Sequence, residues 1–213
     1  MGYVYDYPRP AVTVDVVAIA VTAGGPRVLL IERRSEPFAG CFALPGGFVD
    51  IDEDLEPAAR RELAEETALD VGPLLEIGAF GAVHRDPRGR SIGVAFAALS
   101  IGEPPHAVAG DDARRAVWRG LGRLPKLAFD HRDIVAAARR RIAERIRLDG
   151  SPAALLAGEF TADDLCRAAE PFDGCPGSPS TLARRLVALG TIRPTGRRRG
   201  RAALYRSTSR RHR

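Results

Sequence analysis

The chain has 213 residues, 45% of them hydrophobic and 28% charged, which is ordinary for a folded protein of one large domain or two small ones. No apolar run approaches the roughly 20 residues of a membrane-spanning helix, so we exclude a membrane protein. The three cysteines form no CxxC pair, which excludes a disulfide scaffold and a zinc ribbon. Because the sequence MGYVYDYPRP lacks the features of a secretory signal, we expect a cytoplasmic protein. Charge divides the chain unevenly, because residues 1–149 carry 20 Lys and Arg against 22 Asp and Glu, whereas residues 150–213 carry 12 against 5.

The first half of the chain predicts several strands and one helix. Residues 11–21 and 27–31 are rich in β-branched and aliphatic side chains, which is typical of buried strands. Residues 54–68 repeat apolar side chains at helical spacing, with Glu and Arg in the gaps. Two more strands are expected at 74–83 and 91–100, on either side of a polar loop. Because strands and helices do not alternate regularly, the predicted fold class is α+β.

A boundary between two domains is expected after the next helix. Residues 117–127 have a mixed pattern that indicates neither helix nor strand, and Asp130 caps a helix that runs to about Leu148. A linker at 149–152 then divides the chain into a first domain, 1–149, and a second, 150–213.

The second domain has the layout of a winged helix. Thr161 is the expected N-cap of a short helix, and Ser178 or Ser180 caps a second helix that stops before Gly190. Two short strands, at 191–194 and 202–205, flank the basic sequence TGRRRGR. This order predicts a DNA-binding module, and the positive charge favours a polyanionic partner; the alternative is a solubilising basic tail.

Three glutamates carry the strongest chemical signal in the chain. Glu62, Glu65 and Glu66 stand at positions i, i+3 and i+4 of the predicted helix, so their carboxylates share one face. Like charges repel at that spacing, which favours a bound hard cation such as Mg²⁺ or Mn²⁺. Arg61 can pair with Glu53 ahead of the helix. The alternative is an ordinary solvated acidic face.

The segment that contains these glutamates resembles the Nudix signature, G-x5-E-x7-R-E-U-x-E-E-x-G-U, in which U is aliphatic. The matching positions are Gly47, Glu53, Arg61, Glu62, Leu63, Glu65, Glu66 and Leu69. One position departs, because Ala68 stands where the second glycine belongs. The resemblance implies an α/β/α sandwich with a mixed sheet.

The Nudix resemblance also implies an activity, the hydrolysis of diphosphates linked to a second moiety with the help of a divalent metal. It makes Glu62, Glu65 and Glu66 the metal ligands, while Arg61 and Glu53 orient them. The backbone carbonyl of Gly46 is a further candidate metal ligand. These five charged side chains are the candidate catalytic set.

Two parts of that reaction lack a firm assignment. Candidate cationic contacts to the diphosphate come from the polar loop HRDPRGR: Arg85, Arg88 and Arg90. Their alternative role is that of a solvated hairpin tip. The general base is unassigned, and the candidates are Glu103, Asp111 and Asp112.

Beyond the signature, the chain is similar to the NrtR-type regulators, which join a Nudix domain to a winged helix. The similarity rests on PRPAVTVD at 8–15, LAFDH at 127–131, FTADDL at 160–165, STLARRLVALGTIRPTG at 180–196 and GRAALYR at 200–206. It implies a homodimer that binds double-stranded DNA and controls genes of NAD metabolism. The candidate DNA contacts are Ser180, Thr181, Arg184, Arg185, Arg197, Arg198, Arg199 and Arg201.

Two functions therefore remain open. The first is a transcriptional regulator that binds ADP-ribose or a related nucleoside diphosphate derivative, with or without hydrolysing it. The second is a plain Mg²⁺-dependent hydrolase of such substrates, similar to an ADP-ribose pyrophosphatase, in which the basic end serves another purpose.

Overall fold

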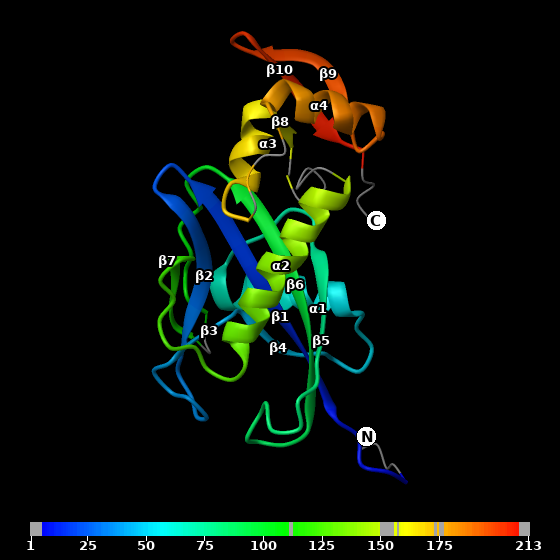
Figure 1. The fold of residues 1–213 in the computed structure, drawn as a ribbon. Coiled ribbons are helices and arrows are strands. Elements are labelled where there is room, and N and C mark those ends of the chain that lie inside the picture. Colours follow the sequence, from blue (N-terminus) through cyan, green and yellow to red (C-terminus); the bar gives the residue numbers. More distant parts are fainter. Residues whose placement is uncertain are drawn as a thin grey trace.

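Helices cover both faces of a seven-stranded mixed sheet (Figure 1). The computed structural model describes residues 6–110, 113–149, 156, 158–172, 174 and 177–208. The strands of the sheet are β1 (Ala11–Thr22), β2 (Gly25–Arg33), β3 (Phe42–Ala43), β4 (Gly46–Phe48), β5 (Leu75–Phe80), β6 (Ser91–Ile101) and β7 (Ala113–Gly120). The path through the sheet is β3-β2-β1-β6-β5, with β4 paired to β1 and β7 paired to β2.

The central strand β1 shows why the sheet is covered on both faces. Ten of its twelve residues are buried in succession, which is the pattern of a strand without a solvent face. Alternate side chains enter two separate hydrophobic clusters, Ile19 in one and Val16 in the other. The pairing of β1 with β6 is parallel and that with β2 is antiparallel, so the sheet is mixed. The predicted α+β class and α/β/α sandwich are therefore confirmed.

Helices α1 (Leu55–Thr67) and α2 (His131–Asp149) supply the two covering layers. Ala58, Ala59 and Leu63 of α1 join the cluster on one face of the sheet. Ile134, Ala138 and Ile142 of α2 join the cluster on the other. The sequence predicted both helices to within two residues, α1 from its periodicity and α2 from Asp130 as its cap.

Strand β7 was missed by the sequence analysis. It pairs antiparallel with β2 along almost its whole length, for example Val117 with Leu30. Three arginines interrupt its short apolar run, so its own sequence indicates no strand. The partner strand determines the conformation here, as tertiary context commonly does for strands.

The C-terminal elements follow the predicted order of helix, turn, helix and hairpin. They are β8 (Glu159–Phe160), α3 (Ala162–Ala169), α4 (Pro179–Ala188), β9 (Ile192–Arg199) and β10 (Ala202–Ser207), and the strands form a small sheet in the order β8-β10-β9. Thr161 caps α3 in a capping box, and Ser178 caps α4, with the Thr181 N–H donating to its hydroxyl over 3.3 Å. Strand β9 extends to Arg199, beyond its predicted end.

These elements lie against one end of the central sheet (Figure 1). Leu165 of α3 and Leu186 of α4 belong to the same hydrophobic cluster as Val21 of β1.

Most of the predicted linker, 150–152, lies outside the described residues, so the division into 1–149 and 150–213 stays a prediction. None of the described helices has both the length and the apolar character needed to cross a membrane. Cys166 is disulfide-bonded, a cross-link that the sequence analysis did not expect.

Candidate functional site

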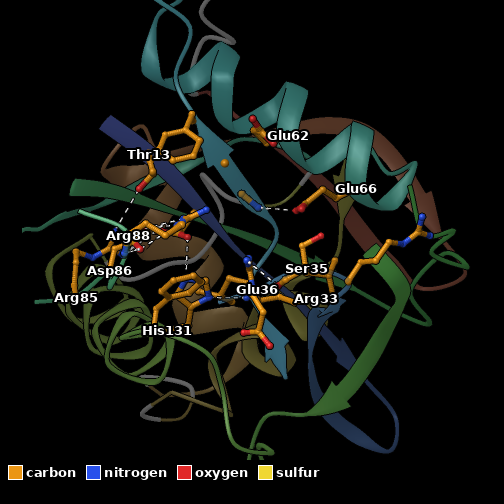
Figure 2. A pocket seen from close by; sticks show the side chains of 18 of the residues that line it. Thr13, Arg33, Ser35, Glu36, Glu62, Glu66, Arg85, Asp86, Arg88 and His131 are labelled. Carbon is orange, nitrogen blue, oxygen red and sulfur yellow. Dashed lines mark hydrogen bonds and ion pairs between the residues drawn. The ribbon is translucent and has the colours of Figure 1, made fainter. Parts of the chain in front are cut away.

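A cavity of about 390 Å³ opens between α1, the loop after β2 and the start of α2. Figure 2 shows Glu62 and Glu66 on the α1 side of this cavity, with Asp86, Arg88 and His131 across from them. Its lining includes Thr13, Asp15, Arg33, Arg34, Ser35, Glu36, Gly46, Gly47, Phe48, Asp50, Arg61, Glu62, Glu66, Arg85, Asp86, Arg88, Phe129 and His131. Charged side chains of both signs face the cavity, which suits a ligand that carries both a phosphate and a metal ion.

Arg61 holds the charged side chains on α1 together. Its Nε donates to both carboxylate oxygens of Glu53, over 3.0 and 3.2 Å, and its Nη2 donates to the Glu53 Oε2 over 2.8 Å. Its Nη1 donates to Glu62 over 2.8 Å and to Glu65 over 3.2 Å. The pairing of Arg61 with Glu53 was predicted from the sequence. The bonds from Arg61 to two of the proposed metal ligands were not.

Backbone close to α1 constrains the positions of two glutamates, Glu66 and Glu62. The N–H of Gly46 donates to Glu66 Oε2 over 2.8 Å, which ties β4 to the helix. At Gly47 a Cβ would lie 2.5 Å from the carboxyl group of Glu62, so the glycine leaves room for that carboxylate. At Gly46 a Cβ would lie 2.1 Å from the carbonyl oxygen of Val14, and φ is +155°. Both glycines are therefore required by close approach.

Burial and charge act differently on Glu62 and Glu53, two of the three acids that bond to Arg61. Burial raises the pKa of Glu62 above its ordinary value, and the hydrogen bond from Arg61 opposes this shift. The same arginine lowers the pKa of Glu53. A half-buried carboxylate of raised pKa gains from a nearby cation, because the cation favours the charged form.

The described residues partly fit a metal ion. Glu62 and Glu66 both line the cavity, and each offers carboxylate oxygens of the kind that Mg²⁺ prefers. Glu65 is exposed and lies outside the lining. Among the residues that the structure describes, no three His, Cys, Asp or Glu side chains are gathered closely enough to hold a metal. The predicted ligand set of Glu62, Glu65, Glu66 and Gly46 therefore stays a prediction.

The three arginines of the HRDPRGR loop have three different environments. Arg85 is buried and bonds to Asp130 over 2.8 Å and to Asp15 over 3.4 Å. Arg88 pairs with Asp86 over 2.8 Å and lines the cavity. Arg90 donates to the backbone carbonyl groups of Gly81, Ala82 and Ser91 and does not line the cavity. Of the three, Arg88 has the geometry that best suits a substrate contact.

Aromatic and histidine side chains complete the cavity, a position that was not predicted for them from the sequence. The guanidinium of Arg88 lies over Phe48 at 5.3 Å and over Phe129 at 5.6 Å. His131 begins α2, and its Nδ1 accepts the N–H of Leu44 over 2.8 Å. The LAFDH motif contains both Phe129 and His131, so this motif was the available signal.

The segment after β6 packs against the end of α1. The N–H of Val108 donates to the carbonyl oxygen of Thr67 over 3.0 Å, and that of Gly110 donates to the carbonyl oxygen of Glu66 over 3.1 Å. Of the candidate general bases, Glu103 is exposed and outside the cavity lining. Asp111 and Asp112 lie outside the described residues, so the base stays unassigned.

The candidate DNA contacts lie on the exposed surface of the C-terminal elements. Ser180 and Thr181 are in the first turn of α4, and Arg184 and Arg185 are exposed further along it. The other four arginines belong to the hairpin of β9 and β10, and all are exposed: Arg197, Arg198, Arg199 and Arg201. Hydroxyl groups in the first turn of a helix, and arginines along a helix and on a hairpin, suit phosphate contacts.

Comparisons with known proteins match both parts of the chain. The model of the NUDIX domain matches residues 11–138. The chain is 44% identical over 129 residues to an ADP-ribose pyrophosphatase of Methanocaldococcus jannaschii, covering 61% of this chain and 73% of that protein. It is 34% identical over 194 residues to the ADPR responsive transcriptional repressor NtrR of Acinetobacter baylyi, covering 89% of this chain and 77% of that protein.

Among solved structures, the chain is similar to NrtR of Shewanella oneidensis complexed with a 27mer DNA. The TM-score is 0.70 and the sequence identity 29%, over 92% of this chain and 93% of that one. The similarity therefore extends over the C-terminal elements as well as the sheet that holds the cavity.

Proposed function

The chain belongs to the Nudix family, and within it to the NrtR type of regulator. On this premise we propose that it binds ADP-ribose or a related nucleoside diphosphate derivative. We propose further that this binding changes its affinity for double-stranded DNA. The observation that carries the proposal is the 34% identity to an ADPR responsive repressor across 89% of the chain. A match of that length reaches beyond residues 11–138, which the NUDIX model matches, into the C-terminal elements.

The cavity would take the diphosphate between a metal ion and arginine side chains. Glu62 and Glu66 would hold Mg²⁺ or Mn²⁺, with Glu65 joining them once Arg61 releases it. The bound ion would neutralise phosphate charge and activate a water molecule. Arg88 would donate to phosphate oxygens from the opposite wall, and Arg61 and Glu53 would keep the glutamates in position. Arg85 also lines the cavity, and its ion pairs with Asp15 and Asp130 would hold this wall in place.

The DNA side of the function would use α4 and the hairpin. Ser180 and Thr181 in the N-terminal turn of α4 suit phosphate or base-edge contacts. Arg184 and Arg185, further along α4, would contact phosphates or bases in the same DNA groove. A homodimer would place two such modules on a two-fold operator. The target genes would be those of NAD metabolism, and the protein would act in the cytoplasm.

Hydrolysis of the ligand is the second candidate function. It is favoured by the complete glutamate set on α1 and by the 44% identity to an ADP-ribose pyrophosphatase over 129 residues. The two functions are compatible, because a regulator that retains its metal ligands can also consume its effector.

The decisive experiment measures DNA binding with and without ADP-ribose at one fixed salt concentration. We expect the protein to bind DNA upstream of an NAD-metabolism operon with higher affinity than a shuffled duplex. We also expect the affinity for the operon DNA to change when ADP-ribose and Mg²⁺ are added. Equal affinity for both duplexes would overturn the regulator function. Glu62→Gln separates the second function, because it should abolish Mg²⁺-dependent turnover of ADP-ribose while the protein still binds DNA.

A further inference from the structure

The arginines of the hairpin fall into two sets with different contacts. In a strand, successive side chains point to opposite faces, so Arg197 and Arg199 share one face of β9 and Arg198 takes the other. Arg197 and Arg199 both reach carboxylates of the same C-terminal unit. Arg198 instead donates to the backbone carbonyl of Arg201, next to the hairpin turn.

Glu159 on β8 receives arginines from both strands of the hairpin. Its carboxylate lies 3.2 Å from Nη1 of Arg197 and 3.4 Å from Nη2 of Arg206. Arg206 is also its direct cross-strand neighbour in the pairing of β8 with β10. The Glu159 side chain is only 17% exposed, so the carboxylate lies beneath the two guanidinium groups.

Asp164 on α3 holds the third arginine of this set. Its Oδ2 lies 3.1 Å from Nη1 of Arg199 and also accepts the N–H of Thr161, over 2.9 Å, as part of the capping box. The second Nη of Arg199 donates to the backbone carbonyl of Glu159 over 3.4 Å. The hairpin is thus fastened to β8 and to the start of α3 by three arginines and two acids.

We propose that Glu159 and Asp164 hold Arg197, Arg199 and Arg206 back from DNA, so that the hairpin contacts phosphate through Arg198 and Arg201 instead. The inference rests on the proposed DNA-binding function and refines it. A guanidinium that donates to a carboxylate has fewer N–H groups left for a phosphate, and the carboxylate itself repels the DNA backbone. The two acids are therefore internal competitors of DNA phosphate.

The salt dependence of DNA binding tests this competition directly. The logarithm of the binding constant falls with the logarithm of salt concentration, with a slope of about 0.9 for each phosphate neutralised on duplex DNA. Glu159→Gln frees Arg197 and Arg206, so we expect the slope to steepen by about 1 to 2 and affinity for a random duplex to rise. Glu159 suits the test better than Asp164, because Asp164 also caps α3.

A matched control separates this effect from a general change of charge. Glu170→Gln removes the same charge from an exposed residue at the end of α3, and Glu170 forms no ion pair with any residue that the structure describes. We expect this control to leave the slope unchanged. A Glu159→Gln slope that equals the control slope, or one shallower than that of the unmodified protein, would overturn the proposal.

Alanine variants of two neighbouring arginines give an independent measurement. Arg198→Ala should make the slope shallower by about 1, whereas Arg197→Ala should change it by clearly less. Equal losses in both variants would overturn the division into two sets. If the unmodified protein bound no DNA at all, both the proposed function and this inference would fail. If it bound DNA with a normal slope that neither Glu159→Gln nor the two alanine variants altered as expected, only the ion-pair inference would be overturned.

Discussion

The backbone N–H of Leu44 donates to Nδ1 of His131 over 2.8 Å, which joins the loop ahead of the cavity to the first residue of α2. Because Nδ1 accepts this bond, the neutral ring carries its proton on Nε2. That nitrogen faces Oδ1 of Asp15 over 3.3 Å. The ring thus positions the wall of the cavity as a neutral group, and burial lowers its pKa.

The lowered pKa of His131 predicts a stability that falls in mild acid. Below pH ~6.5 the unfolded chain binds a proton that the buried ring does not, so the free energy of unfolding decreases as pH falls. We expect a loss of about 1 kcal/mol from this residue between pH 7.5 and 5.5, measured by urea unfolding. His131→Gln should lose that part of the pH dependence. Identical pH profiles for the two proteins would show that the pKa of His131 is the same in the folded and unfolded chain, which would contradict this prediction.

Ala68, at the end of α1, lies in a left-handed conformation, with φ 55° and ψ 24°. An alanine there costs about 1–2 kcal/mol that glycine avoids, while glycine costs about 0.4–1 kcal/mol of unfolded-chain entropy. Ala68→Gly should therefore raise the free energy of unfolding by about 0.5–1 kcal/mol in urea titrations. Gly190 has φ 70°, so Gly190→Ala should lower the free energy of unfolding. A lower free energy of unfolding in Ala68→Gly would contradict the claim that the left-handed conformation strains Ala68.

Local signals in the sequence were sufficient for the helices and their ends. Thr161 caps α3 as predicted, Ser178 is the one of the two predicted serines that caps α4, and Gly190 follows α4 with a positive φ. These features depend on residues three or four positions apart. Strand β7 depends instead on a partner strand about 90 residues earlier, and no local pattern reports that partner.

The same distinction holds within the candidate site. The signature spacing correctly paired Arg61 with Glu53, eight residues apart. Loop chemistry suggested a ligand contact for Arg85, and that stays a prediction: Arg85 lines the cavity, but its ion-pair partners Asp15 and Asp130 lie 70 and 45 residues away, where no local pattern reports them. Glu65 shares a helical face with Glu62 but remains exposed, because the cavity covers only part of that face.

Gly47 and Gly46 should respond differently to alanine. A Cβ at Gly47 meets the flexible end of Glu62 at 2.5 Å, so Gly47→Ala displaces that carboxylate and should weaken Mg²⁺-dependent ADP-ribose binding about tenfold, by calorimetry, with little loss of stability. At Gly46 the Cβ meets the backbone of Val14 at 2.1 Å, so Gly46→Ala should lower the free energy of unfolding instead. Unchanged ligand affinity in Gly47→Ala would argue against a role for Glu62.

Arg88 and Arg90 stand two residues apart and offer a matched test of the cavity wall. The guanidinium of Arg88 lines the cavity beside Phe48 and Phe129, so Arg88→Ala removes a charge-assisted donor worth about 1.5–3 kcal/mol. ADP-ribose affinity should fall roughly 10- to 100-fold by calorimetry. The N–H groups of Arg90 go to backbone carbonyls of the loop, so Arg90→Ala should keep the affinity and lose stability. Equal affinity losses in the two variants would mean that the loop, rather than Arg88 itself, determines binding.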